Sequence, residues 1–186
     1  MWQTVFAEFA AGPRADEAEI DRAEAELGFA LPESYRSFCL ACGAGLACGS
    51  VRIAIPSRTE SADLVTRSEL IAHSIASVIE MREGHRFDIE GDDPSVVERA
   101  CFFGETEAGE FLFWDVAVGA DEAGLREYEI WVMGADLESV RFGGSDLPDL
   151  MRRVQGPAVR GILGMGAEPL PASFVGDGTE GSAGLH

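Results

Sequence analysis

The chain has 186 residues, with 33 acidic and 14 basic side chains that give a formal net charge of −19. Every basic residue is arginine, so chemistry that needs a lysine, such as a Schiff base or a P-loop, is excluded. The acidic excess argues against nucleic acid as a partner, because a protein that neutralises phosphates needs a net basic face.

The length predicts one domain, and the hydropathy pattern predicts a cytoplasmic protein. Residues 1–8 lack a basic region and already contain the acid Glu8, so they do not resemble a signal peptide. The longest uncharged stretch, residues 37–51, is shorter than the roughly 20 apolar residues that cross a bilayer. We therefore expect no membrane partner, and we expect the four cysteines to be thiols rather than a disulfide framework.

The chain begins with two predicted short helices. Asp16 and Glu19 match a capping box at the start of the first helix, and Gly28 is placed to end it. Pro32 lies in the first turn of the second helix, where its missing N–H costs nothing. Apolar side chains recur on one face of this helix at the spacing i, i+3, i+4, i+7, namely Tyr35, Phe38, Cys39 and Cys42.

A strand, a longer helix and a polar loop are predicted next. Residues 51–55 alternate as in a strand that ends near a proline. Residues 63–82 carry an apolar stripe at helical spacing, which predicts a half-buried helix. Residues 84–94 are polar and acidic, so we expect an exposed loop there.

The second half of the chain predicts three strands and a closing helix. Residues 101–103, 110–116 and 129–133 are rich in aromatic and branched side chains, and glycine-containing turns separate them. Ser145 or Asp146 can cap the last helix. Helices, then strands, then one helix predict an α+β domain in which helices pack on a mainly antiparallel sheet.

The predicted domain does not include the two ends of the chain. Residues 1–15 are expected to be an N-terminal lead, and residues 16–156 to be the domain. Residues 157–186 are expected to be a C-terminal extension that is flexible from about residue 164, because Gly, Ala, Pro, Ser and Thr dominate there.

Three segments match the sequence motifs of a known family, in the same order along the chain. Residues 20–38 contain Leu-Gly followed by Leu-Pro-x-x-Tyr, residues 102–115 contain a strand, a glycine turn and a strand that ends in Asp, and residues 128–132 form the next strand. In these features the chain resembles the SUKH superfamily, the Smi/Knr-like proteins. The resemblance covers residues 16–155 and implies a single SUKH-like α+β domain.

The resemblance implies structural roles for the residues that the family shares. Leu31 and Pro32 would set the entry of the second helix, Tyr35 and Phe38 would pack it, and the glycines would form turns. The positions that match the family are Glu24, Leu27, Gly28, Leu31, Pro32, Tyr35, Phe38, Gly43, Gly104, Gly109 and Asp115.

The resemblance also implies a protein-binding domain without enzymatic activity and without a cofactor. Many bacterial members are immunity proteins that bind and neutralise a cognate toxin, often a nuclease, while eukaryotic relatives act as interaction hubs. We therefore expect an immunity protein. The alternative is a Smi/Knr-like scaffold or regulatory interaction module.

The residues themselves predict neither a metal site nor a catalytic site. Four thiolates could bind zinc, but there is only one Cys-x-x-Cys pair, and its two members lie on an apolar helix face. Buried thiols are the favoured interpretation, and a redox or metal role stays the alternative for Cys39, Cys42, Cys48 and Cys101. Residues 88–92 begin like a calcium-binding loop, but Asp93 stands where that loop needs glycine.

The acidic residues are the candidates for partner binding. Ten acids and one arginine lie between Glu105 and Glu138, which predicts a negative face there. Such a face would attract a basic protein partner, such as a toxin domain, and would imitate phosphate to a nuclease. The candidate residues are Asp88, Glu90, Asp92, Asp93, Asp115, Asp121 and Glu122.

Overall fold

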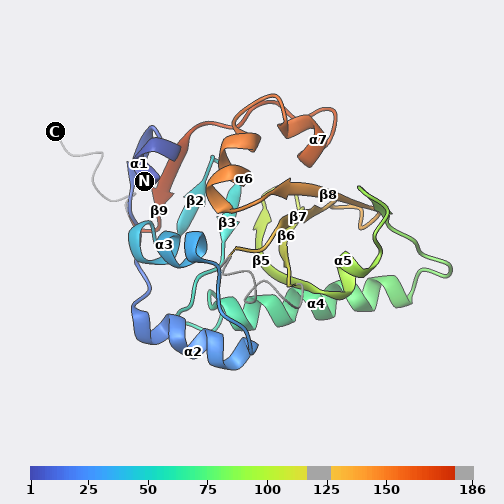
Figure 1. The fold of residues 1–186 in the computed structure, drawn as a ribbon, viewed down its shortest axis with the longest axis horizontal. Helices are drawn as coiled ribbons and strands as arrows, with labels where there is room; N and C mark the ends of the chain where they lie inside the picture. Colours follow the sequence, from blue (N-terminus) through green and yellow to red (C-terminus); the bar gives the residue numbers. More distant parts are fainter. Residues whose placement is uncertain (117–126, 179–186) are drawn as a thin grey trace.

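The computed structural model describes residues 1–116 and 127–178, and within these ranges it has seven helices and nine strands (Figure 1). In chain order they are α1 Trp2–Val5, β1 Glu8–Ala10, α2 Glu17–Leu27, α3 Glu33–Ala41, β2 Gly45–Ala47, β3 Val51–Ile53, α4 Leu64–Glu80, β4 Asp88–Ile89, α5 Ser95–Glu98, β5 Ala100–Thr106, β6 Phe111–Asp115, β7 Ile130–Met133, β8 Ser139–Gly144, α6 Leu147–Val154, α7 Val159–Leu163 and β9 Ser173–Gly176.

All nine strands belong to one sheet, in the order β1-β9-β2-β3-β5-β6-β7-β8-β4. The neighbours from β9 to β8 pair antiparallel, and the two outermost pairs, β1 with β9 and β4 with β8, are parallel. The predicted α+β fold with a mainly antiparallel sheet is therefore confirmed.

Strands β5, β6 and β7 are buried on both faces. Phe102, Phe113 and Trp131 pack in one apolar cluster with Ile71 and Ile75 of α4. The alternate positions contribute to a second, larger cluster with α1, α3, α6 and α7. Because successive side chains of a strand point to opposite faces, a run of apolar residues serves both clusters. The sheet is thus a middle layer, with α4 along one side and α6 on the other in Figure 1.

The predicted helices form where their local signals place them. Asp16 caps α2 in a complete capping box with Glu19, and Gly28 ends the helix in the left-handed conformation at φ 82°. Asp63 caps α4, and Asp146 rather than Ser145 caps α6. Each cap satisfies backbone N–H groups that have no partner within the helix.

The two ends of the described chain differ from the sequence expectation. Residues 164–178 were expected to be flexible, yet β9 lies within them, between β1 and β2 in the sheet. The physical reason is Phe174, whose ring is buried against Phe6, Phe9 and Phe38. One buried aromatic residue and strand pairing thus hold a segment whose composition is otherwise typical of a loop.

The acidic loop predicted over residues 84–94 contains a short strand. β4 pairs in parallel with β8, with Asp88 opposite Ser139 and Ile89 opposite Val140. Ile89 is buried in the same cluster as Trp131, while Asp88 is exposed. Neither β4 nor β8 was predicted, because β4 has two residues and β8 ends in two glycines.

Candidate functional site: the family motif and an acidic sheet edge

Glu24 fixes the link between the first two motif helices. Its carboxylate accepts a hydrogen bond from the backbone N–H of Leu31 at 2.8 Å and another from Nη1 of Arg36 at 2.7 Å. The acid on α2 therefore holds both the start of the Leu-Pro segment and the middle of α3. This contact explains why an acid and Leu-Pro occur at this spacing in the motif.

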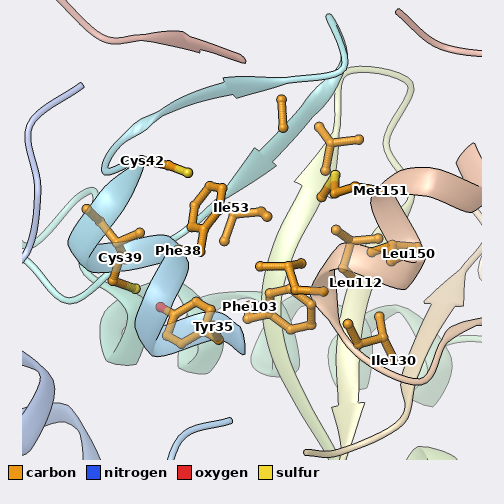
Figure 2. Packing of buried hydrophobic residues seen from close by; sticks show 14 of the residues in the cluster. Tyr35, Phe38, Cys39, Cys42, Ile53, Phe103, Leu112, Ile130, Leu150 and Met151 are labelled. Atoms are coloured by element: carbon orange, nitrogen blue, oxygen red, sulfur yellow. The ribbon is translucent and has the colours of Figure 1, made fainter. Parts of the chain in front are cut away.

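Tyr35 and Phe38 anchor α3 in the larger apolar cluster (Figure 2). Tyr35 is fully buried, its ring meets Trp114 edge to face at 4.8 Å between centroids, and its hydroxyl donates to the carbonyl of Ala54 at 2.7 Å. Phe38 packs edge to face on Trp2 and Phe174. These two motif residues thus join α3 to the sheet and to both ends of the described chain.

The motif glycines lie where a side chain is excluded or the backbone is left-handed. At Gly43, φ is 79° and an added Cβ would lie 2.3 Å from the carbonyl oxygen of Pro13. Gly104 lies at a register shift between β5 and β6, and Gly109 turns the chain between these strands at φ 95°. The implied turn roles of these residues agree with this geometry.

Asp115 lies at the end of β6 and is bound by Arg99. Nε and Nη2 of Arg99 donate to the two carboxylate oxygens at 2.5 and 2.7 Å. The same guanidinium also reaches Asp93 at 3.3 Å. Asp115 is only 9% exposed, so it supports the neighbouring acidic segment from behind rather than facing solvent.

The parallel pairing of β4 with β8 brings two acidic segments together at one end of the sheet. The backbone N–H of Asp88 donates to the carbonyl of Glu138 at 2.7 Å, which places residues 88–93 beside the β7–β8 turn. We call this group the acidic edge, and it comprises Asp88, Glu90, Asp92, Asp93, Asp136 and Glu138. All six residues are exposed.

The acids of this edge differ in their internal contacts. Asp88 pairs with Arg141 at 2.5 Å, and the Glu90 carboxylate accepts from the backbone N–H of Phe142 at 2.9 Å. Among the described residues, no side chain binds the carboxylate of Asp92 or Glu138. The first two acids therefore shape the edge, while the last two offer their charge to solvent.

Two of the predicted partner-binding residues, Asp121 and Glu122, lie outside the residues that the structure describes. Of the remaining predictions, the structure brings four onto the acidic edge and places Asp115 behind it. Asp136 and Glu138 were not chosen individually from the sequence. Only the parallel β4–β8 pairing reveals them as neighbours of Asp88.

A hollow of about 550 Å³ adjoins the acidic edge. It lies between the β7–β8 turn and α7, and its lining includes Asp136, Ser139 and Arg141 on one side and Ile162 and Met165 on the other. Met165 is 82% exposed. One acid of the edge, Asp136, thus lines a concave surface that also carries an exposed apolar side chain, a combination suited to protein binding.

Glu127 makes a partly buried contact that the sequence does not reveal. Its carboxylate accepts from the backbone N–H and the hydroxyl of Ser34, both at 2.7 Å, although 93 positions separate the two residues. Burial raises the pKa of Glu127, the bonds from Ser34 oppose this shift, and the negative charges of Asp146 and Glu33 reinforce it. Glu127 thus ties the chain before β7 to the start of α3.

The four cysteines are buried free thiols, and burial raises the pKa of each. The pKa of Cys42 rises to about 12. Within residues 1–116 and 127–178, no three His, Cys, Asp or Glu side chains are grouped to hold a metal ion. In the same ranges, no helix is both long enough and apolar enough to cross a membrane.

Comparison with known proteins agrees with this geometry. The family model described as the SMI1 / KNR4 family (SUKH-1) matches residues 14–153. No curated protein matches the chain. The matched range contains the contacts of Glu24, Tyr35 and Asp115, whereas β1, α7 and β9 lie outside it. Because the match covers well over half of the sequence, the chain belongs to the SMI1/KNR4 (SUKH-1) family.

Proposed function

We propose that this chain is a cytoplasmic, non-enzymatic immunity protein that binds a basic toxin domain and blocks it. The acidic edge is the docking surface, and the adjoining hollow receives apolar side chains of the toxin. Family membership supports a protein-binding role. The observation that carries the choice of surface is the β4–β8 pairing, which gathers six exposed acids beside a hollow of about 550 Å³.

Charge complementarity explains how such a surface would act. Exposed acids raise the rate of encounter with a basic partner, and carboxylates imitate the phosphates that a nuclease binds. Among the described residues, no group hydrogen-bonds the carboxylates of Asp92 and Glu138, so these two acids are the most available to a partner. The ion pair of Arg99 with Asp115 supports the segment of residues 88–93, because Arg99 also contacts Asp93.

The test is co-expression with the candidate toxin domain from the neighbouring gene, followed by gel filtration and binding measurements. We expect rescue of growth, a stable complex, and an affinity that falls steeply as salt rises. An affinity that stays constant between low and high salt would overturn the electrostatic docking.

A matched pair of double variants locates the surface. Asp92→Asn with Glu138→Gln should weaken binding about tenfold at low salt. The control, Glu8→Gln with Glu69→Gln, removes the same charge from exposed positions on β1 and α4 and should leave binding unchanged. Equal effects of the two pairs would place the interface elsewhere.

The alternative function is a scaffold or regulatory module that uses the same fold. Its discriminating observation is the neighbouring gene, because a large secreted toxin with a variable C-terminal domain supports immunity, whereas housekeeping neighbours support regulation. Failure to rescue growth, together with no complex on gel filtration, would favour the regulatory module.

A further inference from the structure

A second concave site lies beside α4, away from the acidic edge. A pocket of about 260 Å³ opens between β3, the start of α4 and β5. Its apolar lining includes Ile53, Ile55 and Ile71. In the sheet, β5, β6, β7 and β8 separate β3 from β4, so this pocket and the acidic edge are different places on the molecule.

The size of this pocket limits what it can hold. Pockets for drug-sized ligands and cofactors have volumes of about 300–1,000 Å³. A volume of about 260 Å³ is smaller, and it suits a single large apolar side chain with its own backbone atoms. The occupant is therefore one residue rather than a nucleotide or a multi-ring cofactor.

Two guanidinium groups among the lining residues keep hydrogen-bond donors unused. Arg52 binds Asp177 through Nη1 only, at 3.0 and 3.1 Å, and Arg67 binds Glu105 through Nη2 only, at 2.7 Å. Among the described residues, the other guanidinium nitrogens of these two arginines make no hydrogen bond. Because arginine has five N–H donors, both side chains can still bind a carboxylate.

We propose that this pocket binds the C-terminal residue of a peptide partner when that residue is apolar. The side chain would lie against the isoleucine lining, and the terminal carboxylate would accept hydrogen bonds from Arg52 and Arg67. The pocket has space for one residue and offers an apolar surface together with N–H groups that can bind a carboxylate. It therefore suits a residue that carries both an apolar side chain and a carboxylate. Among the residues of a peptide, only an apolar residue at the C-terminus carries both groups, since the side chains of Asp and Glu are short and end in the carboxylate itself.

The site goes beyond the proposed immunity function and does not depend on it. Its rim carries two arginines and two acids, so it is locally balanced in a chain with a net charge of −19. A ligand carboxylate therefore meets no net negative charge from these four side chains, whereas the acidic edge carries six exposed acids. Binding of a peptide end and docking of a basic toxin would use opposite charge complementarity.

Methyl-resolved NMR of the full chain tests the proposal with defined peptides. N-acetyl-Gly-Gly-Phe should give saturable shifts of the methyl groups of Ile53, Ile55 and Ile71, with a Kd on the order of 1 mM. Its C-terminal amide should bind at least about tenfold more weakly because it lacks the carboxylate, and N-acetyl-Gly-Phe-Gly should do so because its carboxylate lies on the next residue, away from the phenylalanine side chain.

Variants distinguish specific recognition of the carboxylate from nonspecific binding of the peptide. Arg52→Gln with Arg67→Gln should abolish the preference for the acid over the amide, whereas the exposed control Arg152→Gln should retain it. Equal affinity for acid and amide, shifts that do not saturate, or a preference that survives in the double variant would each overturn the proposal. The toxin experiments do not bear on these outcomes.

Discussion

Arg99 donates hydrogen bonds to both carboxylate oxygens of Asp115, with donor–acceptor distances of 2.5 and 2.7 Å. This pair joins the start of β5 to the end of β6. The pair borders the acidic edge, since Arg99 also contacts Asp93. It connects the family's structural aspartate to the surface that we propose for partner binding.

Removing this guanidinium should destabilise the protein. Arg99→Met leaves the nearly buried Asp115 without its cation, and the free energy of unfolding should fall by about 2 kcal/mol. Urea denaturation measures the change. Arg152→Met, which alters an exposed arginine, should change stability by less than about 0.5 kcal/mol, and a similarly small effect of Arg99→Met would show that the pair contributes little.

Comparing Gly43 with Gly28 distinguishes the cost of a left-handed backbone conformation from the cost of a steric clash. Both have positive φ, but an added Cβ meets nothing within 4 Å at Gly28 and meets backbone at 2.3 Å at Gly43. Gly28→Ala should cost about 1–2 kcal/mol through conformation alone. Gly43→Ala should cost clearly more, because the Pro13 backbone must move. Equal losses in thermal or urea denaturation would contradict this steric reading.

Tyr35 should contribute through its ring more than through its hydroxyl. Tyr35→Phe removes the bond to the Ala54 carbonyl and should cost about 1 kcal/mol. Tyr35→Ala also empties a buried site against the stacked rings of Trp114 and Phe103 and should cost about 3–5 kcal/mol. If denaturation gave similar losses for both variants, the hydroxyl rather than ring packing would dominate.

Asp63 should make stability depend on acidic pH. Burial opposes its ionisation, but hydrogen bonds from Arg22 and from the backbone of Ser57 and Thr66 prevail and lower the pKa below its usual value. The stabilisation is therefore present above the unfolded pKa, about 3.9, and is lost as pH falls through the lower folded value.

Asp63→Asn provides the comparison for this pH effect. It should be less stable than the wild type at neutral pH, and the difference should shrink below about pH 4, where the unfolded aspartate protonates first. Urea denaturation at several pH values measures it. A difference that stays constant down to acidic pH would show that Asp63 does not carry this dependence.

The four thiols should be unreactive in the folded protein. All four are buried and free, and burial raises their pKa values, so little thiolate is available. A disulfide reagent at pH 8 should label them only after denaturation. Rapid labelling of the native chain would reveal an exposed or activated cysteine.

Local signals were enough to predict the helices of the motif. The Asp16 capping box, Gly28 and Pro32 act within a few positions of one another, so their effect is visible in the sequence. The same holds for the aromatic strands β5 to β7. Strands β1 and β9 were missed because they pair with segments distant in the chain, and β2, β4 and β8 were missed because they are short or contain glycine.

Local spacing and the apolar pattern were enough to indicate the family, the α+β class and the helices of the motif. The three-dimensional packing establishes which acids share a surface and that Glu8–Ala10 and Ser173–Gly176 pair in the sheet. Parallel pairing joined Asp88 to the β7–β8 turn, and burial of Phe174 placed β9 in the sheet. Both depend on long-range packing, whose free energy no short stretch of sequence contains.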